Sequence, residues 1–131
     1  MASETAHINT LKLEGKGEVK ITDDVVSVIA GLAAADVKGV ASLAGNTTRE
    51  VIGKLGFKSL NKGIRLVVED DKVRVWLKVN IRYGFNVPET SAAVQDRVAT
   101  AIETMTGLTV SEVNVRVNSV VVDGVKTDAA Q

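Results

Sequence analysis

The chain lacks or nearly lacks several residue types on which common protein functions depend. Its 131 residues include no cysteine, one proline and one histidine, and aromatic residues make up only 3%. The absence of cysteine excludes disulfide bonds and thiolate metal sites. The single histidine, His7, has no neighbour in sequence that would orient it for proton transfer. The sequence therefore offers few of the side chains on which catalysis depends.

The chain has no excess of charge of either sign and no long apolar run. Sixteen Lys and Arg residues balance sixteen Asp and Glu residues, so no overall field attracts nucleic acid or an anionic membrane. The most apolar stretch, residues 25–43, contains Asp36 and Lys38 and is too short to cross a bilayer. The N-terminus lacks the apolar segment of a signal peptide. We expect a cytoplasmic protein.

Hydrophobic residues make up 45% of the chain, which is enough for the core of one domain. We expect a single α+β domain over residues 11–124, with flexible tails over residues 1–10 and 125–131. The many valines and few aromatic residues favour closely packed strands and slender helices.

The first half of the chain predicts a strand followed by a helix. Residues 18–21 alternate between charged and apolar, which is typical of a strand. Thr22 suits a helix N-cap, apolar residues recur at helical spacing over 25–37, and Gly39 is expected to end the helix. Residues 48–55 predict a short second helix.

The second half predicts a β-hairpin, a helix and a last strand. Apolar residues alternate over 64–68 and 73–81, on either side of a polar turn. Pro88 suits the first turn of a helix that carries one apolar stripe and ends at Gly107. Residues 113–117 predict the last strand.

The predicted order of elements is β-α-β-β-α-β, with the short helix after the first main helix. This order matches a split βαβ, two-layer sandwich of the α+β class. The two main helices are expected on one face of a mostly antiparallel sheet. The residues expected to be buried between them are Ile29, Val75, Leu77, Val94, Val98, Ile102 and Val115.

No arrangement of side chains indicates catalysis. The sequence has no nucleophile elbow and no acid–base pair. Gly15-Lys16-Gly17 lacks the spacing of a phosphate loop, and the acidic run at 69–71 has no further ligands at calcium-loop spacing. Both are interpreted as turns. We expect no catalytic residues, no cofactor, no metal site and no small-molecule substrate.

Trp76 is the most informative single residue. It lies between Arg74 and Lys78, on the strand side opposite Val75 and Leu77, which are expected in the core. Trp76 is either an exposed interface anchor or a side chain covered by a terminal segment. On the first interpretation, Trp76, Arg74 and Lys78 form a candidate interface through which copies of the chain associate.

The basic stretch over residues 49–65 is a second candidate surface. Against one acidic residue it carries Arg49, Lys54, Lys58, Lys62 and Arg65. Such a stretch is either a docking patch for an acidic protein, a lipid headgroup or RNA, or a solvated loop and helix face. Few aromatic side chains accompany it, which disfavours a stacking platform for nucleic-acid bases.

Several distinct short segments follow one another along residues 15–120, approximately. They are Gly17-x-Val19-x-Ile21, Ile29-Ala30-Gly31-x-Ala33, Gly39-Val40, Lys62-Gly63, Tyr83-Gly84, Val87-Pro88, Met105-Thr106-Gly107-Leu108 and Val113-Asn114-Val115. With this set the chain resembles the alkaline-shock, or envelope stress response, family of Gram-positive bacteria. Arg82 departs from the acidic or bulky residue that the family usually has before Tyr83-Gly84.

The resemblance implies a non-catalytic, self-associating scaffold in the cytoplasm. In some members an integral-membrane partner holds the protein at the membrane, in a role linked to cell-envelope stress. Another branch is tied to control of acetyl-CoA carboxylase and fatty-acid synthesis. The implied partners are a second copy, a membrane-anchored protein or an acetyl-CoA carboxylase subunit. The alternative function is a nucleic-acid-binding module that uses the basic stretch 49–65.

Overall fold

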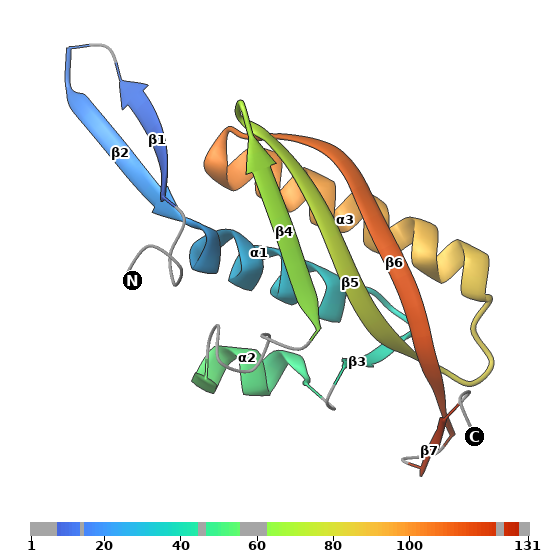
Figure 1. Ribbon diagram of the computed structural model, residues 1–131. Helices are drawn as coiled ribbons and strands as arrows, with labels where there is room; N and C mark the ends of the chain where they lie inside the picture. Colours follow the sequence, from blue (N-terminus) through green and yellow to red (C-terminus); the bar gives the residue numbers. More distant parts are fainter. Residues whose placement is uncertain (1–7, 14, 45–46, 56–62, 123–124, 129–131) are drawn as a thin grey trace.

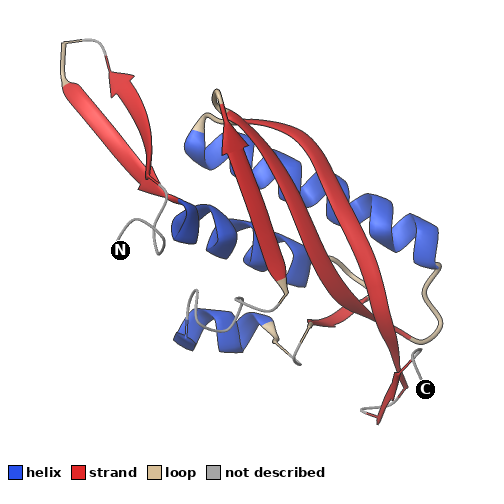
Figure 2. Cartoon of the chain, viewed as in Figure 1, coloured by secondary structure: helices blue, strands red, loops and turns tan. Residues whose placement is uncertain are grey.

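The computed structural model describes residues 8–13, 15–44, 47–55, 63–122 and 125–128. The elements in chain order (Figure 1) are β1 (Ile8–Leu13), β2 (Gly17–Thr22), α1 (Asp23–Ala35), β3 (Val40–Leu43), α2 (Arg49–Leu55), β4 (Ile64–Glu69), β5 (Lys72–Arg82), α3 (Val87–Thr106), β6 (Thr109–Val122) and β7 (Val125–Asp128). β1 and β2 form a hairpin of their own, and the other strands form one five-stranded sheet. Figure 2 shows α1 and α3 behind this sheet and the hairpin reaching away from it.

Strand β5 is the centre of the five-stranded sheet. β4 pairs antiparallel with residues 72–77 of β5, and β3 pairs antiparallel with residues 79–81. β6 runs parallel to β5, and β7 pairs antiparallel with the end of β6. Parallel neighbours need a long crossover connection, and α3 provides it between β5 and β6.

Helices α1 and α3 cover one face of the sheet. α3 buries Val94, Val98 and Ile102, which are spaced four residues apart and are each 0% exposed. α1 buries small residues, including Ala30 and Ala34, and small side chains let a helix approach its neighbours closely. The alternate residues of β5 that meet the helices are Val73, Val75, Leu77, Val79 and Ile81, none more than 1% exposed.

Side chains next to the helices set where each helix begins and ends. The Thr22 hydroxyl accepts a hydrogen bond from the backbone N–H of Val25 (3.4 Å) at the start of α1. The Asn86 side-chain oxygen accepts one from the backbone N–H of Glu89 (2.9 Å) at the start of α3. α3 ends at Gly107, whose φ of 78° lies in the left-handed region that glycine adopts readily.

Gly39 joins α1 to β3 at a point where only glycine fits. Its φ is 101°, and a Cβ atom placed there would lie 2.8 Å from Cδ2 of Phe85. An alanine would therefore be strained in its backbone and would collide with the Phe85 ring. The close approach brings the β5–α3 turn against the end of α1.

Most elements predicted from the sequence are confirmed. The β4–β5 hairpin, the N-cap at Thr22, the short helix α2 and the long helix α3 lie where they were expected. The α+β class, with two main helices on one face of a mostly antiparallel sheet, is confirmed as well.

The strand arrangement differs from the predicted split βαβ sandwich. β2 does not join the main sheet but pairs with β1 along its whole length. β5 and β6 are direct neighbours, so no strand splits the β5–α3–β6 unit. Val40–Leu43, for which no strand was expected, forms β3. An alternating pattern identifies a strand but does not determine which strands it pairs with.

Both segments that were expected to be flexible tails, residues 1–10 and 125–131, contain residues of a strand. β1 begins at Ile8, and β7 covers Val125–Asp128. β7 pairs with residues 119–122 of β6, so the backbone of this edge finds hydrogen-bond partners. Four residues are too few for alternation to indicate a strand.

Two of the residues expected in the core are only partly buried. Ile29 lies on the side of α1 that borders a groove between α1 and α3. Val115 lies where β6 is an edge strand, because β7 pairs only with residues 119–122. The other expected core residues, Val75, Leu77, Val94, Val98 and Ile102, are confirmed as buried.

A buried polar cluster connects β3, β5 and β6. Asn80 of β5 is 0% exposed. Its Nδ2 donates to Oγ of Ser42 in β3 (2.8 Å), and its Oδ1 accepts from Oγ of Ser119 in β6 (2.6 Å). The pairing register shifts beside Asn80 on both sides of β5. The cluster therefore satisfies its buried polar groups where the ladders are irregular.

The burial of the helices predicts unequal effects of two isoleucine truncations. Ile102→Ala is expected to lower the free energy of unfolding by about 2–5 kcal/mol, because it opens a cavity in a closed core. Ile29→Ala is expected to cost clearly less, because Ile29 is only partly buried. Urea unfolding of both variants checks this, and equal losses would contradict the assigned burial.

Candidate functional site

The sheet face opposite α1 and α3 carries the side chains that alternate with the buried row of β5. Successive strand residues point to opposite faces of a sheet. Arg74, Trp76 and Lys78 therefore lie on this second face, which is toward the viewer in Figure 1. Across the sheet, Arg65 of β4 and Asn114 of β6 are the register partners of Trp76. We call this surface the Trp76 face.

Trp76 lies between two arginine side chains. The guanidinium carbons of Arg65 and Arg74 are each 5.4 Å from the centre of the indole ring. This distance is typical of cation–π contacts. Trp76 is partly buried, so part of its side chain remains exposed on this face. The sequence left open whether Trp76 is exposed or covered, and the structure places it in between.

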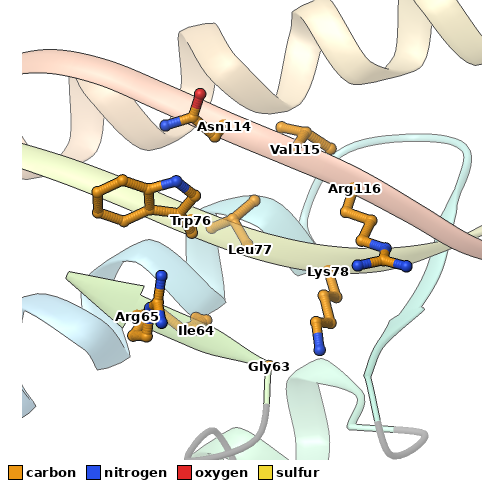
Figure 3. Close-up of a pocket in the computed structure, with 9 residues that line it drawn as sticks. All are labelled: Gly63, Ile64, Arg65, Trp76, Leu77, Lys78, Asn114, Val115 and Arg116. Atoms are coloured by element: carbon orange, nitrogen blue, oxygen red, sulfur yellow. The ribbon is translucent and has the colours of Figure 1, made fainter.

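A hollow of about 360 Å³ lies beside Trp76 (Figure 3). Its lining residues come from three neighbouring strands and the turn before β4: Gly63, Ile64, Arg65, Trp76, Leu77, Lys78, Asn114, Val115 and Arg116. Lys78 and Arg116 are register partners on β5 and β6 and are both exposed. The hollow therefore has an indole and three basic side chains in its lining and no acidic one.

The Trp76 face is positively charged although the chain is neutral. Its acidic side chains among the described residues of β4, β5 and β6 are Glu69 and Glu112. Its basic side chains on the same strands are Arg65, Lys72, Arg74, Lys78 and Arg116. Asn114 donates a hydrogen bond from Nδ2 to Glu112 Oε1 (2.9 Å), which holds that carboxylate near the edge of the face. The arrangement is suited to binding anionic groups.

The structure brings together the three predicted interface residues but divides the predicted basic stretch. Arg49 of α2 donates to Asp36 (2.6 Å) at the end of α1, away from Trp76, and Lys54 is an exposed residue of α2. Arg65 lies on the Trp76 face. Lys58 and Lys62 lie outside the described residues. Arg49 and Arg65 thus lie on different surfaces.

Arg116 and Asn114 are members of the site that sequence reasoning missed. They alternate with Val113 and Val115 on β6, as Trp76 alternates with the core residues of β5. This alternation was visible in the sequence. The parallel pairing that places Arg116 opposite Lys78 was not, because local sequence does not specify parallel neighbours.

A second hollow, of about 410 Å³, lies between α1 and α3 on the side away from the sheet. Its apolar lining includes Ile29, Leu32, Ala33 and Ala101, and Met105 at its edge is 68% exposed. At the other end, Asp36 accepts hydrogen bonds from the guanidinium groups of Arg49 (2.6 Å) and Arg97 (2.9 Å). We call this surface the α1–α3 groove.

The described residues carry neither a metal-binding cluster nor a membrane-spanning helix. In the part of the chain that the structure describes, no group of three or more His, Asp or Glu side chains could hold a metal ion. None of the described helices is long and apolar enough to cross a membrane.

A sequence profile of the Asp23 family, which has a cell envelope-related function, matches residues 12–122. The chain belongs to this family. The match runs from β1 to the end of β6 and includes every element of the Trp76 face. It confirms the resemblance to envelope stress proteins that the ordered segments indicated. The family name does not refer to the residue Asp23 of this chain.

The relatives fall into uncharacterized proteins and stress regulators. The uncharacterized protein YqhY of Bacillus subtilis is 32% identical over 101 residues, covering 77% of this chain and 75% of YqhY. The uncharacterized protein Spy1535 of Streptococcus pyogenes is 34% identical over 108 residues, covering 82% and 81%. A stress response regulator, the gls24 homolog of Streptococcus pyogenes, is 30% identical over 103 residues, covering 78% of this chain and 58% of the regulator. No solved structure matches the chain.

The arginines of the Trp76 face lie at the surface, so we expect them to contribute little to the stability of the fold. Arg65→Gln is expected to lower the free energy of unfolding by at most about 1 kcal/mol, because Arg65 is exposed and an exposed cation–π contact is worth about 0.5–1 kcal/mol. Arg74 is partly buried, so Arg74→Gln is expected to cost somewhat more, but less than about 2 kcal/mol. Thermal and urea unfolding measure the loss. A loss of more than about 2 kcal/mol for either variant would mean that the arginine holds the sheet together.

Proposed function

We propose that this member of the Asp23 family is a non-catalytic interaction protein that supports the cell envelope under stress by docking a partner on the Trp76 face. The family supports the link to the envelope. The name of one relative, a stress response regulator, supports a regulatory role. The observation that carries the proposal is the arrangement of Trp76 between Arg65 and Arg74 on the sheet face opposite the two main helices. Tryptophan and arginine are the residues most enriched among energetic centres of protein interfaces.

The described side chains favour docking over catalysis. Among the described residues of the Trp76 face, the carboxylate of Glu112 accepts a hydrogen bond from Asn114, an amide that acts as neither nucleophile nor base. A catalytic site needs a nucleophile and a base within hydrogen-bond reach, or a metal. The relatives' names, a stress response regulator and uncharacterized proteins, name no enzyme.

The family resemblance suggests two partners and a location. A membrane-anchored protein would hold a cytoplasmic chain at the envelope, and an acetyl-CoA carboxylase subunit would connect it to fatty-acid synthesis. Both partners rest on the resemblance alone. Testing purified candidates of both kinds against the wild-type chain and Trp76→Ala distinguishes them, since only the true partner loses affinity in the variant.

A complementation experiment tests the proposed role of the Trp76 face. In a host that lacks the gene, wild-type protein is expected to restore survival under cell-envelope stress, and Trp76→Ala is expected to fail at equal protein level. Val25→Ala, which shortens an exposed apolar side chain outside both the Trp76 face and the α1–α3 groove, serves as the control. Full rescue by Trp76→Ala would overturn the proposal.

Self-association is a separate proposal, and we assign it to the α1–α3 groove instead of the Trp76 face. A symmetric contact brings the same patch of both copies together. On the Trp76 face this would bring the basic side chains of one copy (Arg65, Arg74 and Arg116) against those of the other, and like charges repel across an interface. The α1–α3 groove is largely apolar, and its Asp36 is already engaged by Arg49 and Arg97.

Light scattering at high micromolar protein concentration tests this assignment. Met105→Glu is expected to lower the molar mass of the oligomer, because it places a charge at the edge of the apolar groove. Trp76→Ala is expected to leave the mass unchanged. The opposite pattern would return self-association to the Trp76 face, and a monomeric wild type would exclude it.

A further inference from the structure

We propose that the partner segment docked on the Trp76 face is an acidic, extended peptide whose carboxylates bind Arg65, Lys78 and Arg116 beside Trp76. This inference rests on the proposed docking function and names the chemistry of the occupant. It follows from the charge, size and surroundings of the hollow beside Trp76.

The Trp76 face contains a pairing of like charges that the fold alone disfavours. Lys78 of β5 and Arg116 of β6 are register partners on adjacent strands, and both are exposed. Like charges directly opposite each other on a sheet are destabilising. Arg65 and Arg74 add a second pair of positive charges around a single indole ring. An anion between these groups would relieve the repulsion, and local rules are most often broken at functional sites.

The basic side chains around the hollow are spaced like the alternate side chains of an extended peptide. Arg65, Trp76 and Asn114 form one row across β4, β5 and β6, and Lys78 and Arg116 form the next row of the same face. Residues two apart along a strand are separated by about 6.5–7 Å, because the rise is about 3.3 Å per residue. Figure 3 shows these side chains around one hollow, whose volume is about 360 Å³. That space fits one or two side chains of a peptide, whose alternate carboxylates share the same spacing.

Nucleic acid fits the hollow less well. Single strands bind to grooves in which bases stack on exposed aromatic faces. Trp76 is the one aromatic residue on this face among the described residues, it is partly buried, and two guanidinium groups already lie against it. The positive charges therefore remain available to an anionic ligand, but the indole ring is not free for a base to stack on it.

A membrane surface also fits less well. Peripheral contact with lipid combines positive charge with apolar side chains that enter the headgroup layer. The large hydrophobic residues that the described structure exposes are Val19, Val25, Tyr83, Phe85, Val87 and Met105. None of them belongs to β4, β6 or the stretch of β5 around Trp76. The Trp76 face is thus charged without an exposed apolar rim.

The fluorescence of Trp76 tests the proposal directly, because the chain contains a single tryptophan. The probe is a synthetic peptide of about ten residues in which glutamate alternates with serine, so that an extended chain presents its carboxylates on one side. The peptide is expected to change the emission of Trp76 saturably, and the affinity is expected to fall as salt screens the charges. A serine-only peptide of equal length is expected to have no effect.

Matched variants assign the response to the hollow. The double variant Arg65→Gln/Arg116→Gln is expected to weaken the peptide by about tenfold or more, because it removes two charged donors. Lys38→Gln/Lys54→Gln removes the same charge from exposed positions elsewhere and is expected to bind like the wild type. Lys54 also belongs to the basic stretch predicted from sequence, so this control compares the two surfaces. Circular dichroism verifies that both variants are folded.

Several results would overturn the proposal. They are an unchanged emission at millimolar peptide, equal weakening in both double variants, or a tighter and variant-sensitive response to oligothymidylate or to phosphatidylglycerol vesicles. If the peptide fails while Trp76→Ala still abolishes survival under envelope stress, the docking function stands and only the acidic occupant is wrong. If Trp76→Ala restores survival, the docking function itself fails.

Discussion

Strand β5 is bonded on both sides, and its strict alternation determines what each face of the molecule presents. One row, from Val73 to Ile81, is closed off by α1 and α3 and is almost fully buried. The other row carries Arg74, Trp76 and Lys78, and no main helix packs on it. Since a shift of one residue would exchange the two rows, the register that buries the valines also fixes the position of the tryptophan. The core and the Trp76 face are therefore two consequences of one pattern.

The parallel pairing of β5 with β6 turns this pattern into a surface of defined charge. It places Arg116 opposite Lys78 and Asn114 opposite Trp76, while β4 supplies Arg65 on the other side. The crossover helix α3 makes the parallel pairing possible and at the same time covers the apolar face with Val94, Val98 and Ile102. A neutral chain thus concentrates positive charge on one side, an arrangement of the kind that can orient a docking partner without a net charge.

The parts of this structure that local chemistry determines were predictable from the sequence. Thr22 and Gly107 mark helix ends because a hydroxyl satisfies free N–H groups and glycine adopts a positive φ. The alternation around Trp76 separated the core side from the candidate interface side. What depends on contacts between distant segments was not predictable: the neighbours of β2 and β6, the short strands β3 and β7, and the arrival of Arg116 beside Trp76. Likewise, the basic residues at 49–65 are close in sequence, but α2 and β4 carry Arg49 and Arg65 to different surfaces.

Photo-cross-linking in living cells from position 72 measures most directly whether a partner protein binds the Trp76 face. Lys72 is exposed at the start of β5, in the same alternating row as Trp76 but outside the lining of the hollow. A photoreactive amino acid there leaves Trp76, Arg65 and Arg116 intact. The account predicts a cross-link to a partner protein through an acidic segment, and its loss when Arg65 and Arg116 are replaced by glutamine. Cross-links only between copies of the chain, or a partner cross-link that survives both replacements, would contradict it.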